Sequence, residues 1–381
     1  MASDRRPRVL LITPDFPPSP GGIQVVTHRI ATLASRLNVR VVTPTYQKVG
    51  MESGAPDGSS ALARGRDDAM GVDVVRSGGT QRTPRLLRLS ARAVAEGAGW
   101  ADLIISGHIV CAPAAAILRR LTGTPVVQYF FAQEIPNRPR LASFAARHSM
   151  RNVSISSYTT ALLRSHVARA APTVQIPPGV DLAGDRHASR PREPTIVVVG
   201  RLRDRYKGHD VLIEAMASVT RRRADARLVV IGDGPLRGEL ENHVRRLGLE
   251  TAVRFAGQVT DAERDRILDD ASIFCMPSRL RDDGAGEGFG IVYLEASARG
   301  LPVVAGAVGG ASDAIVHGKT GLLVDPCDPD AVAAALQGLL DDSAVAHRMG
   351  TAGVERAKTF AWPLIVGQIE DLVFEVLKQE R

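Results

Sequence analysis

The stretch GEGFGIVYLEASARG, residues 286–300, sets two glutamates eight positions apart in a glycine-spaced apolar run. It follows a predicted strand at 273–277, and a helix is predicted to begin at Gly288. Backbone N–H groups and the positive dipole end at a helix start favour an anion such as a phosphate. A carboxylate only accepts hydrogen bonds and suits paired hydroxyl groups. The segment therefore predicts a ligand that carries both phosphates and hydroxyls.

The two glutamates are expected to serve different parts of that ligand. Glu287 lies just before the predicted helix, and Glu295 is about two turns into it, roughly 12 Å further along at 1.5 Å per residue. One can hold a sugar and the other a ribose, while the amides of Gly288, Phe289 and Gly290 face the phosphates between them. The alternative for each glutamate is a helix cap or a surface residue.

A second candidate lies in GRLRDRYKG, directly after the predicted strand TIVVV. Arg201 and Lys207 share one strand-to-helix loop and can converge on a diphosphate, Arg as a fork and Lys as a point charge. Solvated surface charge is the alternative for this pair.

A third candidate is the glycine pair in TPDFPPSPGGIQ, after the first predicted strand. Gly21 and Gly22 lie at the start of a predicted helix over 22–37, so backbone amides can approach an anion closely. The alternative is an ordinary turn at a helix start. The pattern is not GxGxxG, and no acidic residue ends the second strand, which argues against a dinucleotide-binding dehydrogenase.

These loops must be positioned by parallel sheets, because short β-branched runs alternate with helical patterns along the whole chain. The first series of predicted strands is 9–13, 39–43, 72–76, 102–106, 125–130 and 152–156. The second is 195–200, 227–232, 253–257, 273–277, 302–306 and 321–325. Each series predicts a Rossmann-like α/β domain, with ligands in a cleft between the carboxyl ends of the two sheets.

The predicted domains are 1–183 and 195–360, joined by the charged, proline-bearing linker 184–194. A final helix over 361–381 shows an apolar face at 365, 369, 372, 373 and 376, and Pro363 suits its first turn or a kink. The polar stretch 47–70 has the composition of a long loop. Asp328 and Asp330 form a D-x-D before an alanine-rich helix, where a helix cap explains them better than a metal site.

Composition narrows the class of protein. The 381 residues include three scattered cysteines, Cys111, Cys275 and Cys327, without metal-site spacing. No apolar run approaches 18 residues and no signal peptide is recognisable, so we expect a cytoplasmic protein. Residues 1–183 hold 22 Lys and Arg against 11 Asp and Glu, whereas the remainder holds 26 against 30. The basic first half favours an anionic partner. Nucleic acid is disfavoured, because aromatic residues are only 4% and no recognition motif is visible.

The segment TPRLLRLSARAVAEG, 83–97, is one place for such a partner. Arg85, Arg88 and Arg92 share one face of the predicted helix with leucines beside them, a pattern that suits the surface of an anionic membrane. A solvated helix face in an arginine-rich chain is the alternative.

The motifs together resemble the retaining GT-B glycosyltransferases of family 4, from about residue 8 to about 360. The segments that carry the resemblance, in order, are PPSPGGIQ, GRLRDRYKG, VIGDGPL, EGFGIVYLEA, GLPVVAGAVGG and HGKTGLLVDP. The pairing of FPPSPGGIQ with EGFGIVYLEA is most similar to the bacterial phosphatidylinositol-mannoside mannosyltransferase branch.

The resemblance implies a role for each matched residue. Arg201 and Lys207 bind the donor diphosphate and stabilise the leaving nucleotide, Glu287 contacts the donor sugar, and Glu295 holds the ribose. Catalysis is therefore expected from Arg201, Lys207 and Glu287. The full set of expected donor-binding residues is Gly21, Gly22, Arg201, Lys207, Glu287, Gly288, Phe289, Gly290, Ile291 and Glu295. The final helix is expected to return to the N-terminal domain.

One position departs from the family's pattern. The family usually has a histidine after the fifth strand, in a motif like THGxE, and the matching residue in YFFAQE is Phe131. A phenylalanine ring neither donates nor accepts a proton, although Glu134 still matches the acidic residue of the motif. The expected sugar and acceptor pocket comprises Gln24, His108, Phe131, Gln133 and Glu134.

The resemblance predicts transfer of a hexose from a UDP- or GDP-sugar to a hydroxyl acceptor, with retained anomeric configuration and no obligatory cofactor or metal. The acceptor is a lipid headgroup, a polysaccharide or a secondary metabolite, and FAGQV at 255–259 is expected to contact the base. The expected partners are the nucleotide sugar and a hydroxyl acceptor, for which an anionic group would suit the basic N-terminal domain. The basic charge of that domain also predicts a peripheral contact with the inner face of the membrane. The competing hypothesis, motivated by Phe131, is a catalytically silent GT-B protein that binds a nucleotide sugar or partners an active transferase.

Overall fold

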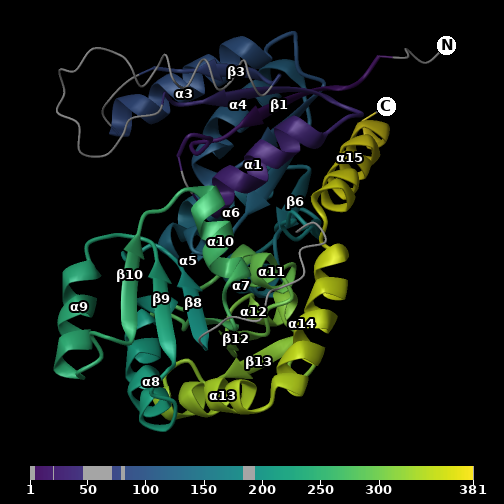
Figure 1. The fold of residues 1–381 in the computed structure, drawn as a ribbon. Helices are drawn as coiled ribbons and strands as arrows, with labels where there is room; N and C mark the ends of the chain where they lie inside the picture. The colour runs from purple at the N-terminus through teal and green to yellow at the C-terminus, as the bar shows by residue number, and fades with distance from the viewer. Residues whose placement is uncertain (1–4, 20, 46–70, 79–81, 183–193, 381) are drawn as a thin grey trace. The chain divides into compact units, whose positions relative to one another are not determined.

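A computed structural model describes residues 5–19, 21–45, 71–78, 82–182 and 194–380 (Figure 1). The chain divides into two compact units. Unit 1 comprises Met1–Gly179 and Trp362–Arg381, and unit 2 comprises Val180–Ala361. The predicted loop at 47–70 and all but the last residue of the predicted linker lie outside the described residues.

Unit 1 is built on a parallel sheet of seven strands in the order β3-β2-β1-β4-β5-β6-β7. The strands are β1 (Arg8–Ile12), β2 (Asn38–Thr43), β3 (Asp73–Arg76), β4 (Leu103–Ser106), β5 (Val126–Phe130), β6 (Arg151–Ser154) and β7 (Thr173–Gln175). The six predicted strands are confirmed, and β7 is an additional edge strand. Strand order reverses between β1 and β4, the point at which a doubly wound sheet binds ligands.

Helices pack on the sheet of unit 1, and its central strands β4 and β5 are buried at every position. The helices are α1 (Gly22–Leu33), α3 (Arg82–Gly97), the 3-10 turn η1 (Ile109–Cys111), α4 (Ala112–Thr122), α5 (Glu134–Asn137), α6 (Pro139–His148), α7 (Ser157–His166) and α15 (Trp362–Gln379). One apolar cluster joins β1, β2 and β4 to α3 and α4, with Leu10, Leu89 and Leu118 fully buried. A second joins β5 to η1, α6 and α7 around Phe130.

Helix α1 is shorter than predicted, because it ends at Leu33 rather than at 37. The N–H of Ala34 still bonds the carbonyl of Ile30, but the N–H of Arg36 donates to the carboxylate of Glu370 at 2.7 Å. A tertiary partner thus takes an amide that a longer helix would have used.

Unit 2 repeats the design with a parallel sheet of six strands in the order β10-β9-β8-β11-β12-β13. The strands are β8 (Thr195–Val199), β9 (Arg227–Ile231), β10 (Val253–Gly257), β11 (Ile273–Met276), β12 (Val303–Gly306) and β13 (Gly321–Val324). All six were predicted. The two parallel α/β sheets confirm the predicted fold class.

The helices of unit 2 are η2 (Arg205–Lys207), α8 (His209–Arg222), α9 (Arg237–Arg246), α10 (Asp261–Asp269), α11 (Ile291–Ser297), α12 (Ala311–Ala314), α13 (Pro329–Asp341) and α14 (Ser343–Lys358). Helix α8 packs on α13, and α11 packs on α14 (Figure 1). Asp328 caps α13, since its carboxylate accepts from the N–H groups of Asp330 and Ala331 at 2.9 and 3.1 Å. The prediction that this D-x-D is a helix cap is confirmed.

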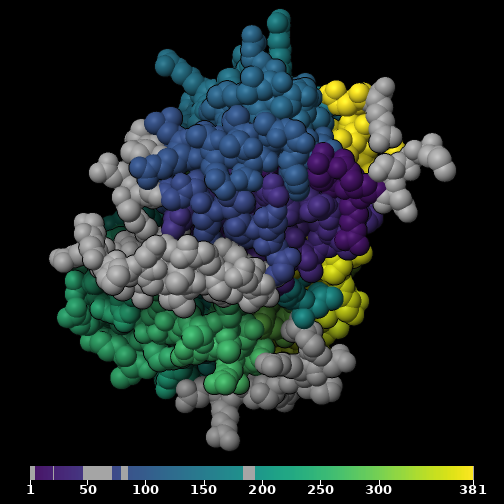
Figure 2. All heavy atoms as spheres, turned by 90° about the horizontal axis from the view of Figure 1, so that it is seen from above, coloured from purple at the N-terminus to yellow at the C-terminus, as the bar shows by residue number. Residues whose placement is uncertain are grey.

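The last helix, α15, belongs to unit 1 although it follows unit 2 in the chain. It packs on α1, and its yellow atoms border the purple N-terminal ones in Figure 2. All five positions of its predicted apolar face are buried, and Pro363 is its second residue. Glu370 anchors it, because its nearly buried carboxylate accepts from both the backbone N–H and the Nε of Arg36 at 2.7 Å. Asp371 meets the same guanidinium at 2.8 Å, but its side chain is 72% exposed.

We expect Glu370→Ala to lower the melting temperature by several degrees, because the substitution leaves a backbone amide and a guanidinium without their buried acceptor. The matched control is Asp371→Ala, which removes an exposed partner of the same arginine and should shift the melting temperature by no more than about 1 °C. Differential scanning calorimetry measures both. Equal shifts for the two variants would contradict this account of how α15 is held.

Candidate active site

Lys207 and Glu287 meet in unit 2, although 80 residues separate them in the chain. The Nζ of Lys207 donates to the carboxylate of Glu287 in a short ion pair. Both side chains are largely buried, 15% and 16% exposed. Two residues predicted for the donor site from separate motifs therefore lie side by side, one after β8 and one after β11.

The ion pair keeps Lys207 charged in spite of its burial. Burial alone lowers the pKa of a lysine, but the carboxylate of Glu287 outweighs this effect and the pKa of Lys207 is raised. The ring of Tyr206 adds to the stabilisation, with Nζ 5.2 Å from its centroid. Arg201, the other predicted diphosphate ligand, is exposed, and its charge acts on Lys207 in the opposite direction. The result is a local excess of positive charge that suits a diphosphate.

Lys207 is held by the turn that contains it. It ends the 3-10 turn η2, and its N–H donates to the carbonyl of Asp204 at 3.2 Å. Gly208 follows with φ of 74°, in the left-handed region that favours glycine. A Cβ on Gly208 would lie 2.1 Å from the carbonyl oxygen of Pro277, just after β11. Glycine thus lets the β8 loop touch the end of β11, and this contact sets where Lys207 lies.

The loop Glu287–Gly290 carries residues predicted to bind the donor, and we call it the donor loop for that prediction. It precedes α11 instead of starting a helix at Gly288. Gly290 has φ of 86°, which breaks the helical path, and it caps α11 at Ile291. Glu295 is therefore about one turn into the helix, not two as predicted. Phe289 is 1% exposed, so its side chain anchors the loop in the core of unit 2.

Glu295 has different surroundings from Glu287. Burial raises the pKa of its carboxyl group, and the guanidinium groups of Arg264 and Arg299 oppose that rise. Arg299 also pairs with Asp265 at 2.6 Å, so Glu295 belongs to a mixed charge cluster between α10 and α11. The two glutamates of the motif thus occupy separate electrostatic environments, in keeping with separate roles.

In unit 1, Gly21 and Gly22 are at the start of α1 as predicted. Gly21 has φ of 146°, and a Cβ there would lie 2.5 Å from the side-chain oxygen of Gln24. The Gln24 side chain thus folds over the glycine at the helix start. A side chain on Gly21 would displace it.

The loop after β5 carries the residues that replace the family's usual histidine motif. The carboxylate of Glu134 accepts from the N–H of Phe131 at 2.5 Å. Burial raises the pKa of Glu134, while the amides of Phe131, Ala132 and Glu134 itself oppose the rise. Ala132 has φ of 115°, an uncommon and strained value for alanine. The half-buried ring of Phe131 stacks on Tyr129 with centroids 6.0 Å apart, and Gln133 follows in the same loop.

His108 has a local structural role. Its Nδ1 accepts from the N–H of Val110 at 3.3 Å and caps the turn η1. Burial lowers its pKa to about 4, with a further contribution from the charge of Arg138. The imidazole is therefore neutral at physiological pH, and a polar contact to a ligand stays a prediction.

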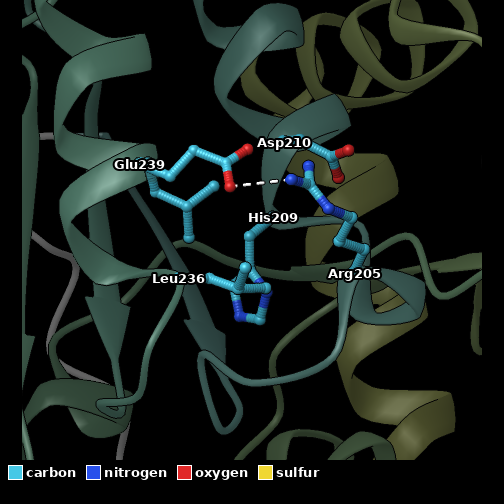
Figure 3. A pocket seen from close by; sticks show the side chains of 6 residues that line it. Arg205, His209, Asp210, Leu236 and Glu239 are labelled. Atoms are coloured by element: carbon cyan, nitrogen blue, oxygen red, sulfur yellow. Dashed lines mark hydrogen bonds and ion pairs between the residues drawn. The ribbon is translucent and has the colours of Figure 1, made fainter.

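A small pocket in unit 2 lies next to the turn of Lys207 (Figure 3). Its lining residues are Arg205, His209, Asp210, Leu236, Glu239 and Leu240. Arg205 closes it by pairing with Glu239 at 2.7 Å. None of the predicted donor residues lines this pocket. Burial lowers the pKa of His209 to about 4, and the charge of Lys207 lowers it further. The sequence offered no signal that distinguished His209 from any other residue at a helix start.

No helix in the described part of the chain is long and apolar enough to cross a membrane. Over the same residues, no three His, Cys, Asp or Glu side chains come together in a way that could hold a metal ion. Independence from metal stays a prediction.

Residues 183–356 match the family of glycosyl transferases group 1. A GDP-mannose-dependent alpha-(1-6)-phosphatidylinositol monomannoside mannosyltransferase of Mycobacterium tuberculosis is 33% identical, and the alignment covers 96% of this chain and 98% of the relative. The chain belongs to the group 1 glycosyltransferases. A related mannosyltransferase of Corynebacterium glutamicum, specific by name for a monoacylated phosphatidylinositol mannoside, is 30% identical over 96% and 97% of the two chains.

Solved structures agree on the fold of this glycosyltransferase. Sucrose-phosphate synthase of Thermosynechococcus elongatus superposes with a TM-score of 0.79 at 23% identity, covering 98% of this chain and all of the other. The Anabaena protein HepE in complex with UDP gives a TM-score of 0.77 at 21% identity, covering 97% and 100%. The resemblance to GT-B glycosyltransferases is thereby confirmed. Lys207 and Glu287 both lie within the matched family segment.

Proposed function

We propose that the protein transfers mannose from GDP-mannose to a hydroxyl group of an inositol-containing phospholipid, with retained anomeric configuration. The observation that carries the proposal is the buried pair of Lys207 and Glu287 at the carboxyl ends of β8 and β11. The names of relatives that match almost the whole chain support both the donor and the acceptor.

Lys207 has the properties that a leaving diphosphate requires. An ammonium has three N–H donors, so Lys207 can bind Glu287 and a diphosphate oxygen at once. Its charge lies in a largely buried position, where an interaction with developing negative charge is stronger than in water. Arg201 adds a second positive charge from the same loop. Together they stabilise the bond cleavage that releases GDP.

Glu287 is proposed to hold the sugar that is transferred. Its carboxylate is fixed by Lys207, and a hydroxyl of the sugar can donate to the same group. In the reaction the bond from the sugar C1 to the diphosphate breaks, and a bond from C1 to the acceptor oxygen forms on the same face. The departing diphosphate accepts the acceptor's proton. This route needs no protein nucleophile and is compatible with Phe131 at the position of the usual histidine.

Glu295 completes the donor site as the ligand of the ribose. The positive charges that act on its carboxylate are those of Arg264 and Arg299. Paired ribose hydroxyls can donate to such a carboxylate without competing for the diphosphate ligands.

Helix α3 and its neighbour α4 are proposed to contact the anionic membrane that contains the acceptor. Arg88 and Arg92 are exposed on α3, and Leu87, next to Arg88 in the chain, is 68% exposed. Ile117 and Leu121 are 50% and 67% exposed on α4, which packs on α3. Such a surface combines charge attraction with apolar insertion.

Sedimentation with vesicles that contain anionic lipid should pull down the wild type. The double variant Arg88→Glu, Arg92→Glu should not bind these vesicles, because its charges repel the anionic lipid. Vesicle binding by the double variant would exclude this surface.

A thermal-shift panel tests the proposed function. GDP-mannose should stabilise the wild type, UDP-glucose should not, and neither should stabilise Lys207→Ala. No stabilisation of the wild type by any nucleotide sugar would overturn the donor site. If GDP-mannose binds tightly but no acceptor elicits GDP release, the silent-protein hypothesis replaces the transferase.

A further inference from the structure

The backbone of the donor loop is held by a second glycine loop. The carbonyl of Glu287 accepts from the N–H of Gly310 at 2.9 Å. A Cβ on Gly310 would lie 2.1 Å from the carbonyl oxygen of Gly288, so the two backbones touch. Any shift of Gly310 must therefore be passed to the donor loop.

Gly310 is the N-cap of the short helix α12, and the far end of that helix is held by Arg356 of α14. The Nε of Arg356 donates to the carbonyl of Ala314 at 2.6 Å, and a terminal nitrogen donates to the carbonyl of Asp313 at 2.5 Å. The planar guanidinium fork suits two adjacent carbonyl groups. Burial lowers the pKa of Arg356, against a smaller opposing effect of the charge of Asp313.

The buried side chain of Phe289, in the donor loop, is connected to Arg356 through Phe360. The Arg356 guanidinium lies 5.2 Å from the ring centroid of Phe360. Phe360 in turn packs on Phe289, with centroids 5.7 Å apart and planes inclined at 56°. The backbone of the donor loop therefore contacts the residue that caps α12, and α12 contacts Arg356. Arg356 contacts Phe360, which packs on Phe289 of the same loop.

Phe360 also lies at the boundary of unit 2. Its carbonyl accepts from the N–H of Val180 at 2.8 Å, and Val180 forms a bridge with Ala361. Val180 and Ala361 are the first and last residues of unit 2, so the chain enters and leaves this unit at one place. The ring of Phe360 packs on Phe289 of the donor loop, and its backbone carbonyl bonds Val180 at the place where the chain enters and leaves unit 2.

We infer that Arg356 and Phe360 are positioning residues for the donor loop and couple it to the place where the chain enters and leaves unit 2. The inference rests on the proposed function for what the loop binds. Neither residue touches the reacting atoms. They fix Glu287 and its neighbouring amides by supporting the loop from its backbone and from Phe289 at once.

The kinetic test compares Phe360→Leu with Phe360→Tyr. Leucine removes the ring that contacts Phe289 and Arg356, and we expect the KM for GDP-mannose to rise at least about tenfold while the KM for the acceptor changes less than twofold. Tyrosine retains the ring, so Phe360→Tyr should have the wild-type KM for GDP-mannose. Arg356→Lys, which lacks the fork, should behave like Phe360→Leu. Leu336→Ala, a buried change in α13, should lower the melting temperature and leave the donor KM unchanged. Equal effects of Phe360→Leu and Leu336→Ala on the donor KM would overturn the inference.

Hydrogen exchange provides a readout that needs no donor. The amides of residues 288–291 should exchange at least about tenfold faster in Phe360→Leu than in wild type, whereas those of α8 and α13 should not change. Unchanged exchange in the donor loop would overturn the positioning role. If the loop responds but GDP-mannose fails to stabilise the wild type, the proposed function fails and the positioning role stands.

Discussion

Lys207→Ala should reduce kcat for mannosyl transfer by roughly a thousandfold, because the leaving diphosphate loses its buried counter-charge. The same change leaves Glu287 without its partner, so the free energy of unfolding should fall by about 3 kcal/mol. Steady-state GDP release and a melting curve measure the two effects. The kinetic assay must be run well below the melting temperature of the variant, so that loss of folding does not contribute.

Arg205→Ala is the matched control for Lys207→Ala. Arg205 belongs to the same turn η2, but its side chain is 59% exposed and pairs with Glu239. Removing it changes the net charge equally and should leave kcat within about twofold of wild type. The proposed role of Lys207 is wrong if Lys207→Ala keeps more than a tenth of the wild-type kcat, or if Arg205→Ala lowers kcat as much as Lys207→Ala does.

Gly208→Ala should destabilise unit 2 by about 3 kcal/mol or more and abolish donor binding. The new Cβ meets the carbonyl oxygen of Pro277 at 2.1 Å, and the φ of 74° is unfavourable for alanine. Relief of the clash requires the β8 loop to move away from β11, which carries Lys207 away from Glu287. Calorimetry and a GDP-mannose titration measure the two consequences.

Gly238→Ala supplies the control, since it is the same substitution in the same unit. Gly238 lies in the first turn of α9, and a Cβ there would meet nothing within 4 Å. Alanine favours the helix, so its stability should equal or exceed that of wild type. Wild-type stability in Gly208→Ala would show that the contact with Pro277 does not constrain the loop.

Most strands could be predicted because fully buried parallel strands appear as continuous β-branched runs. Strand β7 was missed because it is a three-residue edge strand of which only Val174 is half-buried. The prediction extended α1 beyond Leu33 for a different reason. The N–H of Arg36, which a longer helix would have used, bonds Glu370, more than 300 residues away, and no local sequence pattern indicates that bond.

The candidate site was predictable in its residues but not in its contacts. Arg201, Lys207, Glu287 and Glu295 each follow a strand whose end could be recognised. Lys207 and Glu287 were expected to bind different parts of the donor, and their ion pair depends on how the β8 and β11 loops pack. The support from Arg356 and Phe360 was not predicted, because neither residue lies in a segment that pointed to a ligand.

The proposed function is that of a mannosyltransferase whose donor site is built around Lys207 and Glu287. The most direct measurement incubates the purified wild type and Lys207→Ala with GDP-mannose and vesicles that contain a phosphatidylinositol mannoside, and follows GDP and lipid product by mass spectrometry. We predict equal amounts of GDP and mannosylated lipid with the wild type, an α-linkage in the product, and roughly a thousandfold slower reaction with the variant. Equal rates for the two proteins, or no GDP from the wild type, would contradict the claim.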